Sequence, residues 1–403
     1  MCTICGGTNF DAKAYNVFMK SRDRGKDYGN LFLKGKSWIC NHRAVPTTEL
    51  ENPEFNQPFG SKYKIVHNGT IANDKELGNQ DGMIDSYILS KCLDCSTLQT
   101  LHKSIQRIQG SYAIAILKPN GTFYLACNYK PIFYAKEANG EFTFSSYKHH
   151  LSSYQNVHRM EPYSILDSET METMDLPRKE YDSAVVVCSG GLDSTAVAAY
   201  AVTKHKKVTL LHFQYGCLAE TKEVSCIKKI ADYLKCDYQL LRIDNTFLNG
   251  QSTLFGDKGK IAEGVKGAEY AYEWVPARNL IMLSIAVGFA EANKFSHIYL
   301  GTNLEESGAY PDNEEQFIKD FDSCLYGAVQ NGLKVQIHTP LGNLMKHEIV
   351  KFGNKYNAPF HLTWSCYKDG ELPCGNCGPC FMRKTAFARN GLKDPLIYEG
   401  EEV

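Results

Sequence analysis

The stretch CSGGLDST, residues 188–195, follows directly on the apolar run AVVV and precedes a helix-like stretch. A glycine-rich turn between a strand and a helix lets backbone N–H groups approach an anion closely, and the helix N-terminus adds a dipole that favours phosphate. It is not a Walker loop, because the lysine of G-x-x-x-x-G-K-[ST] is missing. The simpler alternative is a Gly-Gly turn with an Asp-Ser cap. The residues of the predicted phosphate site are Ser189, Gly190, Gly191, Leu192, Asp193 and Ser194.

The hydrophobic pattern of the sequence changes across the polar, proline-containing stretch DSETMETMDLPRKEYD. Before it, alternating runs such as YKIVHNGTI, GSYAIAILK and GTFYLAC predict a layered domain rich in antiparallel sheet. After it, the apolar runs AVVV, KVTLLHF and YQLLRI are separated by helix-like stretches. That order predicts right-handed crossovers and a parallel sheet that binds ligands beyond the carboxyl ends of its strands. We therefore expect domains at 2–165 and 182–403, joined by a linker at 166–181.

Composition narrows the class of protein. The 403 residues are 43% hydrophobic, enough for two or three domains. No apolar run reaches about 18 residues and no leader-like N-terminus is present, so we expect a cytoplasmic protein with no membrane partner. The odd count of 15 cysteines suits reduced thiols better than a disulfide framework. The net charge of -1 argues against strong non-specific binding to duplex nucleic acid, and the basic stretches 20–26 and 382–393 are expected to be solvated surface.

Four cysteines near the C-terminal end follow the spacing C-x7-C-x2-C-x2-C. Four thiolates on a short, glycine-bearing segment can complete a tetrahedral zinc shell with no open position, which is the mark of a structural site. An iron–sulfur cluster, which also takes four cysteines, and unligated thiols are the alternatives. The predicted ligands are Cys366, Cys374, Cys377 and Cys380.

The block SGGLDS resembles the PP-loop of ATP pyrophosphatases, which adenylate a carboxyl or amide group and release pyrophosphate. Together with the four cysteines it is similar to QueC, the family that converts 7-carboxy-7-deazaguanine to 7-cyano-7-deazaguanine with ATP and ammonia. The stretches VPARN, GTNLEESGAYPDN and TPLGNLMKHEIV agree with that family. Glu306 stands where the family usually has Asp, and Asn313 where it usually has Cys. The resemblance implies that the nucleotide and deazaguanine pocket includes Arg278, Asn279, Asp312 and Lys346.

Cys2 becomes the terminal residue if Met1 is removed, which the small cysteine side chain permits. Its α-amino group, with a pKa of about 8, could then act as the base for its own thiol. Any chain can carry a cysteine in second place, so this signal is weak by itself. Cys5 makes a C-x2-C pair with Cys2, and half of a metal site is the competing interpretation.

Five further stretches fall in the order seen in class II glutamine amidotransferases: CNHRAVPT, VHNGTIAN, DGMIDSYIL, GSYAIAIL and CNYKPIFYA. The resemblance covers roughly the first 160 residues and implies an N-terminal-nucleophile hydrolase αββα sandwich. It also implies that Cys2 attacks the glutamine amide while the Asn68 side chain and the Gly69 N–H form the oxyanion hole. Arg43 would hold the α-carboxylate of glutamine, and Asp85 its α-ammonium group.

The fused order resembles Gat-QueC proteins, which are associated with forming a C7 formamidine on a deazaguanine within nucleic acid, in archaeal tRNA or phage DNA. It implies glutamine, ATP with Mg²⁺, structural Zn²⁺ and a 7-deazaguanine base as ligands, and it admits a homodimer. If a phage encodes the chain, the host cytoplasm is its location. Asparagine synthetase has the same outline but lacks the zinc pattern.

Two enzymatic hypotheses therefore remain, and because the two domains are fused we expect the first of them. They are amination of a cyano-deazaguanine in DNA or tRNA, and synthesis of 7-cyano-7-deazaguanine from the free 7-carboxy base. The intact SGGLDS block favours ATP-driven chemistry, because turning a carboxylate into a nitrile needs ATP whereas adding ammonia to a nitrile formally does not. A catalytically silent module that binds deazaguanine or nucleic acid is the third hypothesis.

Overall fold

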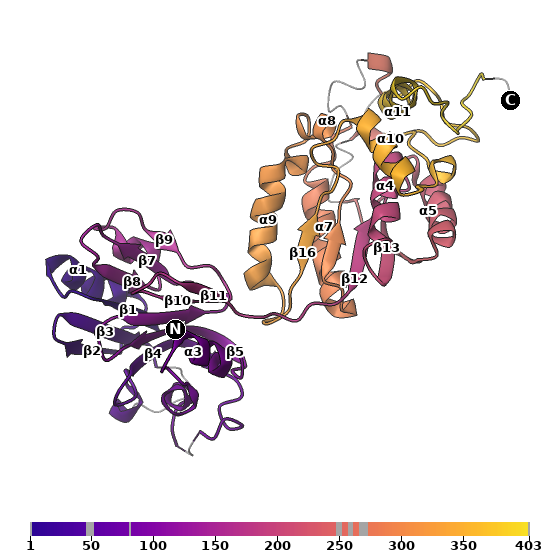
Figure 1. Ribbon diagram of the computed structural model, residues 1–403. Coiled ribbons are helices and arrows are strands. Elements are labelled where there is room, and N and C mark those ends of the chain that lie inside the picture. Colours follow the sequence, from indigo (N-terminus) through magenta and orange to yellow (C-terminus); the bar gives the residue numbers. More distant parts are fainter. Residues whose placement is uncertain are drawn as a thin grey trace. The chain divides into compact units, whose positions relative to one another are not determined.

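The computed structural model describes residues 2–45, 52–79, 82–246, 252–256, 261–265 and 273–401. The chain divides into two compact units, Met1–Arg178 and Lys179–Val403, and each is described here by itself (Figure 1). Among the described residues, no helix combines the length and apolar character needed to cross a membrane.

The first unit contains two antiparallel sheets. In spatial order, sheet A consists of β2 (Tyr28–Lys34), β3 (Ser37–Arg43), β1 (Thr3–Gly7), β8 (Phe142–Ser145), β7 (Phe133–Lys136) and β9 (His158–Arg159). Sheet B consists of β11 (Thr173–Asp175), β10 (Ser164–Asp167), β6 (Phe123–Cys127), β5 (Gly110–Leu117) and β4 (Lys64–Ile71). Its helices are α1 (Ala12–Lys20), α2 (Leu89–Cys92) and α3 (Leu98–Ile105), with short 3₁₀ turns η1 (Ser21–Asp23), η2 (Pro53–Phe55), η3 (Asp85–Ile88) and η4 (Lys148–Leu151).

Alternation along the strands explains why these sheets form layers. Ile4 and Ile39 of sheet A are fully buried against residues of sheet B such as Val66. Their neighbours Cys5 and Cys40 point to the opposite face, where they pack under α1. Successive side chains of a strand leave on opposite faces, so one sheet can contact a second sheet and a helix at once. α3 lies against β10 of sheet B.

The predicted linker is shorter in the structure than the sequence suggests. Residues 166–181 were expected to connect the domains, but β10 and β11 pair within this range, with Leu166 opposite Thr173. The first unit extends to Arg178, and the second begins at Lys179. β10 is buried, whereas β11 at the edge of the sheet is mostly exposed and polar. This polar composition is why the sequence suggested a linker.

The second unit contains one parallel sheet of five strands. In spatial order they are β14 (Asp237–Arg242), β13 (Lys207–Gln214), β12 (Ser183–Val187), β15 (His297–Tyr299) and β16 (Gln336–His338). The helices are α4 (Leu192–Ala201), α5 (Glu220–Leu234), α7 (Arg278–Asn293), α8 (Leu304–Ser307), α9 (Glu315–Ala328), α10 (Lys346–Lys355) and α11 (Gly378–Arg389), with 3₁₀ turns η6 (Thr253–Phe255), η7 (Pro311–Asn313) and η8 (Phe360–Leu362). The structure thus confirms a mixed α/β fold with a parallel sheet.

Helices cover both faces of this sheet, as Figure 1 shows. α4, α5, α10 and α11 pack on one face, and α7 and α9 on the other. The strands are buried on both sides, which explains why β12 reads as a continuous apolar run rather than an alternating one. Strands β13 and β15 lie on opposite sides of β12, so the order of the sheet reverses there and creates a switch point.

One expectation about the surface is wrong in part. The basic stretch 382–393 was expected to be solvated, but Arg383 is only 1% exposed. Its Nε donates to Asp394 Oδ2 at 2.8 Å, and its Nη1 donates to Thr363 Oγ1 at 2.6 Å. A buried arginine survives because its planar donors are all directed at fixed acceptors.

Candidate functional site

The glycine-rich loop of the second unit lies at the carboxyl end of β12. The strand ends at Val187, the chain turns through Gly190, and α4 begins at Leu192. Gly190 has a φ of 82°, in the left-handed region that favours glycine. The N-terminal end of α4 therefore faces a pocket at the switch point of the sheet. Loop residues that line this pocket are Ser189, Gly191, Leu192, Asp193 and Ser194.

Lys346 joins two acids at one wall of the pocket. Its Nζ donates to Asp193 Oδ2 at 2.5 Å and to Glu306 Oε1 at 3.1 Å. Burial would lower the pKa of the Lys346 ammonium group, but the charges of Asp193 and Glu306 outweigh it and raise that pKa. Burial likewise would raise the pKa of the Glu306 carboxyl, but the charge of Lys346 and its hydrogen bond lower it. Glu306 thus provides an acidic partner for Lys346 at this wall.

Arg278 and Asn279 stand at the beginning of α7 and line the same pocket. Asp312 is 7% exposed and is not among the residues that line it. Its Oδ2 accepts the backbone N–H of Asn279 at 2.9 Å, so its carboxylate caps α7. Asn279 Nδ2 also donates to Asn313 Oδ1. Of the four residues predicted to bind the ligand, three line the pocket and Asp312 holds Asn279 in place.

His212 and Glu223 also line the pocket, and the sequence analysis did not identify them. His212 lies near the end of β13, and Glu223 lies in the first turn of α5. Burial raises the pKa of the Glu223 carboxyl to about 7, against the opposing charge of Arg278. Burial lowers the pKa of the His212 imidazole, which favours its neutral form. A glutamate in a helical first turn has an ordinary explanation, the helix dipole, so its sequence signal is weak.

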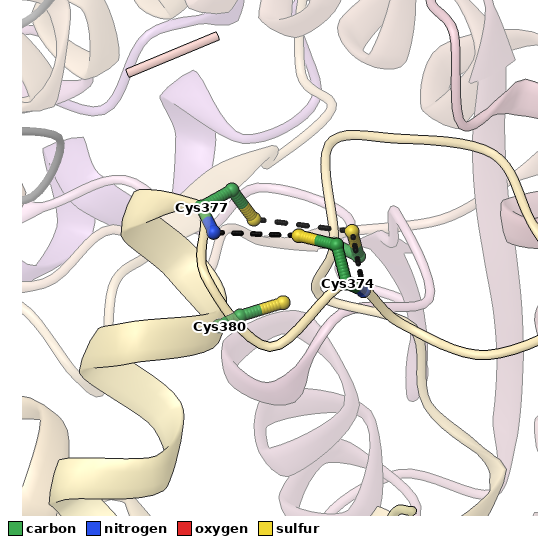
Figure 2. A group of neighbouring side chains, drawn as sticks. Cys374, Cys377 and Cys380 are labelled. Atoms are coloured by element: carbon green, nitrogen blue, oxygen red, sulfur yellow. Dashed lines mark hydrogen bonds between the residues drawn. The ribbon is translucent and has the colours of Figure 1, made fainter. Parts of the chain in front are cut away.

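The four predicted cysteine ligands form one cluster. Their Sγ atoms all lie within 4.8 Å of one another, and all four residues are buried. The backbone N–H of Cys377 donates to Cys374 Sγ at 3.3 Å, and the N–H of Cys374 donates to Cys366 Sγ at 3.5 Å. Figure 2 shows the sulfur atoms of Cys374, Cys377 and Cys380 turned toward a common centre. Buried thiols supported by backbone N–H groups can hold a metal ion as thiolates.

The candidate glutamine site of the first unit gathers at the end of β1. Thr3 pairs with His42, so Cys2 and Arg43 lie at the same end of neighbouring strands. The pKa of the Cys2 thiol is raised, mainly by burial; Asp85 raises it further, whereas the Ala44 N–H and the charge of Arg43 oppose the shift. The charges of Arg43 and Asp85 therefore both reach the Cys2 sulfur.

Asn68 and Gly69 lie on β4 of sheet B. Asn41 Nδ2, on β3 of sheet A, donates to His67 O at 3.2 Å and so ties the two sheets together beside Asn68. Asp85 Oδ2 accepts the N–H of Ile71 at 2.6 Å, which holds this carboxylate at the end of the same strand. Gly69 has a φ of 154°, and a Cβ there would lie 1.9 Å from Ser111 O, so only glycine fits.

Cys5 does not extend this site. Its side chain groups with Cys40 and His42 on the α1 face of sheet A, and their ligand atoms lie within 4.8 Å of one another. None of the 15 cysteines forms a disulfide in the structure. Side chains that are an odd number of residues apart on a strand point to opposite faces of the sheet, and Cys2 and Cys5 are three residues apart. The C-x2-C spacing therefore does not mark two ligands of one metal site.

Family models match both units. The model for queuosine biosynthesis protein QueC matches residues 183–391, and a glutamine amidotransferase domain matches residues 43–153. Cys2 lies ahead of the second match.

Relatives match either the whole chain or about half of it. A 7-cyano-7-deazaguanine synthase of Sulfolobus acidocaldarius is 43% identical over 95% of this chain and 88% of its own length. One from Saccharolobus solfataricus is 41% identical over the full length of both chains. The synthase of Nautilia profundicola is 38% identical over 54% of this chain and 98% of its own length.

Solved structures resemble the chain more distantly. The U34-tRNA thiolase NcsA from Methanococcus maripaludis is 12% identical over 53% of this chain and 67% of its own, with a TM-score of 0.32. An NH3-dependent NAD synthetase from Campylobacter jejuni is 18% identical over 46% of this chain and 68% of its own, with a TM-score of 0.28.

Proposed function

Because the chain belongs to the QueC family of 7-cyano-7-deazaguanine synthases and adds a glutamine amidotransferase domain to it, we propose that it aminates the C7 substituent of a 7-deazaguanine with glutamine nitrogen and ATP. The single observation that carries the proposal is the whole-length similarity to relatives named for this synthase. The intact loop residues and the grouping of Cys2, Arg43 and Asp85 speak against a silent binding module.

The first unit is the source of ammonia and has the N-terminal-nucleophile hydrolase fold. The Cys2 sulfur attacks the side-chain amide carbon of glutamine, and the Asn68 amide and the Gly69 N–H stabilise the resulting oxyanion. Ammonia leaves, and water hydrolyses the thioester to glutamate. Arg43 holds the substrate carboxylate and Asp85 its ammonium group. The two-sheet layering and the glycine-only geometry of Gly69 support this assignment.

The second unit activates the acceptor. Backbone N–H groups of the SGGLDS loop and the N-terminal end of α4 bind the phosphates of ATP. Asp193 Oδ1 is buried and, within the described parts of the chain, accepts no hydrogen bond. A carboxylate oxygen of this kind suits Mg²⁺, which neutralises phosphate charge when it is bound. Lys346 orients Asp193, while Arg278 and Asn279 contact the nucleotide or the base.

The four-cysteine cluster holds a structural zinc ion. The residues fit this ion because four buried sulfur atoms lie within 4.8 Å of one another and would supply the four thiolate ligands of a structural site. A bound zinc would fix the start of α11 against the loop that carries Cys366. Cys226, Ala219 and Trp364 pack around the cluster, so it supports one wall of the pocket.

The acceptor is free 7-carboxy-7-deazaguanine, and the product is the 7-cyano base. Relatives that share both units are named for this reaction, and shorter relatives of about half this length carry the same name. Turning a carboxylate into an amide and then a nitrile removes oxygen, and adenylation by ATP makes each oxygen a leaving group. The pocket at the ATP loop supports that use of ATP.

A second candidate is formation of a formamidine on a cyano-deazaguanine within tRNA or DNA. The fusion of a glutaminase to the synthase unit favours it, because the shorter relatives span only about half of this chain. The net charge of -1 is compatible with either substrate. Homodimer formation is also compatible with both.

The two candidates are separated by one experiment. Purified protein receives glutamine and ATP with free 7-carboxy-7-deazaguanine in one tube, and with cyano-modified tRNA or DNA in another, and products are read by mass. We expect the nitrile in the first tube, together with glutamate and pyrophosphate. An amidine in the second tube without a nitrile in the first would replace the primary proposal by the second candidate. No glutamate release in any tube would support the silent module.

A further inference from the structure

A pair of buried groups faces the pocket beside the ATP loop and has no role in the function described so far. His212 is 1% exposed, and the Glu223 side chain is 16% exposed. They lie on β13 and α5, and both line the pocket that contains Ser189 and Asp193. The pair therefore adjoins the loop that is proposed to hold ATP.

His212 lines the pocket, and one of its two ring nitrogens has no hydrogen-bond partner among the described residues. Nδ1 lies 3.0 Å from the carbonyl oxygen of Cys188, which can only accept, so Nδ1 carries the proton and donates. Nε2 of a neutral imidazole is then an acceptor. It is buried and has no hydrogen-bond partner among the described residues. A buried acceptor without a donor is costly, which points to a ligand that supplies one.

Glu223 presents a second acceptor to the same space. Its Oε2 lies 4.0 Å from His212 Nε2, too far for a direct hydrogen bond. The thiol of Cys217 donates to the same oxygen at 3.7 Å. The titratable groups whose contacts or charges reach Glu223 are His212, Cys217, Glu220, Arg278, Tyr215, Cys188 and Cys226. Burial among them raises the pKa of its carboxyl to about 7, so near neutrality it can both accept and release a proton.

Two acceptors 4.0 Å apart select a small ligand with at least two N–H or O–H groups. A molecule that donates to both would lie about 2.9 Å from each. Phosphate and carboxylate groups are poor candidates, because they bring further acceptors toward a carboxylate. Ammonia has three N–H bonds and fits, and the proposed function requires it in this pocket.

We propose that His212 and Glu223 bind ammonia in the synthase unit and that Glu223 is the base that takes a proton from it. The ammonia lone pair forms a C–N bond to the carboxyl carbon of the adenylated substrate, which leaves an extra proton on nitrogen. The Glu223 carboxylate accepts that proton, and the bond from carbon to the AMP oxygen breaks with its electron pair on AMP. The products are the amide, AMP and a protonated Glu223, which returns its proton to solvent. This inference rests on the proposed function.

The test supplies ammonium chloride in place of glutamine, so that the first unit is not needed, and uses the full chain. It measures product formation at varied ammonium and at varied 7-carboxy-7-deazaguanine, and separately the substrate-dependent exchange of pyrophosphate into ATP, which needs no ammonia. The variants are Glu223→Gln and His212→Gln. Asp232→Asn, on the exposed face of the same helix, is the matched control.

We expect Glu223→Gln to lower kcat with ammonium by about 100-fold, the usual scale for loss of a general base, and to leave pyrophosphate exchange within about twofold. His212→Gln should raise the KM for ammonium by about tenfold, the equivalent of one lost hydrogen bond to a polar ligand. In the parent, kcat at saturating ammonia should fall as pH drops below about 7, and Glu223→Gln should abolish that dependence.

Three results would overturn the inference while leaving the proposed function intact. These are unchanged kinetics in both variants, a raised KM for the deazaguanine instead of ammonium, and loss of pyrophosphate exchange in Glu223→Gln but not in Asp232→Asn. The second would assign the pair to the N–H groups of the base, and the third to adenylation. If the parent itself shows no substrate-dependent exchange, the proposed function fails first and the inference with it.

Discussion

At the scale of single residues, Lys346 joins two acids at the wall of the pocket described above. Its ammonium group contacts Asp193 and Glu306, and removing it would leave two carboxylates facing each other. Breaking a buried ion pair from one side costs about 3–5 kcal/mol. We expect Lys346→Met to lower the free energy of unfolding by that amount in urea titrations and to reduce pyrophosphate exchange at least 100-fold.

The matched control is Lys351→Met, because Lys351 lies on the exposed side of the same helix. Its unfolding free energy should change by less than about 0.5 kcal/mol. If Lys346→Met has the same free energy of unfolding as the parent, the contacts of Lys346 with Asp193 and Glu306 do not stabilise the fold.

Asn68 offers a test of the oxyanion assignment in the first unit. It is 7% exposed on β4, so truncating it removes a preorganised donor rather than a surface group. We expect Asn68→Ala to lower the glutaminase kcat by about 100-fold to 1,000-fold with little change in KM, measured as glutamate release. Asn139→Ala, at an exposed turn of the same unit, should keep full activity. Equal losses in both variants would speak against the assignment.

Candidate residues in contiguous motifs can be recognised in the sequence, whereas residues assembled by the fold cannot. The SGGLDS block and Asn68-Gly69 each occupy one turn or one strand, so their spacing is visible in the chain. His212 and Glu223 lie close together only because β13 ends, and α5 begins, beside the same loop. Asp312 was predicted to bind the ligand, but a carboxylate that caps a helix is not distinguishable in sequence from one that binds a substrate.

At the scale of elements, the four-cysteine segment adds a second anchor to α11, which already packs on the core through Ala386 and Phe387. Cys377 caps this helix and Cys380 lies in its first turn, so a bound ion would join the helix to the preceding loop. We expect one zinc per chain by elemental analysis, and loss of zinc with a lower Tm in Cys377→Ser, because binding energy at a structural site is folding energy. Cys324→Ser, at an exposed cysteine, should change neither. Iron and sulfide in place of zinc would favour the cluster alternative.

His297, at the start of β15, and His338, at the end of β16, form a pair that is expected to make the second unit sensitive to acid. His297 Nδ1 and His338 Nε2 lie 3.0 Å apart, and burial, with the neighbouring histidines, lowers the pKa of His338 to about 4. An unfolded histidine has a pKa near 6.5, so the unfolded chain binds the proton first. This contribution is complete above about pH 6.5 and is lost as the pH falls toward 4; because solvent screens the partly exposed ring, the loss is about 1–2 kcal/mol.

The measurement is the free energy of unfolding of the second unit in urea from pH 7 to pH 4.5. His338→Gln should flatten the decline, because it removes the titrating group from both states. A decline of the same steepness in His338→Gln would assign the acid sensitivity to other groups.

Element types were easier to predict than element limits. A continuous apolar run such as β12 is typical of a strand that is buried on both faces in a parallel sheet covered by helices. The hairpin of β10 and β11 was missed because its second strand has an exposed edge and a polar composition, so pairing with β10 rather than local propensity decides its structure. Arg383 of α11 is a similar case. From the sequence alone an arginine is expected at the surface, and its burial is explained only by the acceptors that the fold places around it.

At the scale of the whole molecule, each unit has its own hydrophobic core. Residues such as Ile4 and Phe144 belong to the core of the first unit, and Val186 and Leu283 to cores of the second. A unit with its own core can remain folded when chemistry in the other is removed. The proposed reaction can therefore be divided into a glutamine-dependent step and an ammonia-dependent step, and each can be tested in the full chain.

Cys2→Ala is the sharpest form of that test. Loss of the nucleophile should abolish glutamate release and lower glutamine-dependent product formation by at least 1,000-fold, since covalent catalysis has no substitute at this position. Ammonium chloride at saturating concentration should restore product formation to the parent rate, because the pocket of the second unit is unaltered. Cys92→Ala, which removes a half-buried thiol from α2, should keep both activities. If ammonium chloride fails to rescue Cys2→Ala while Cys92→Ala stays active, the first unit does more than release ammonia.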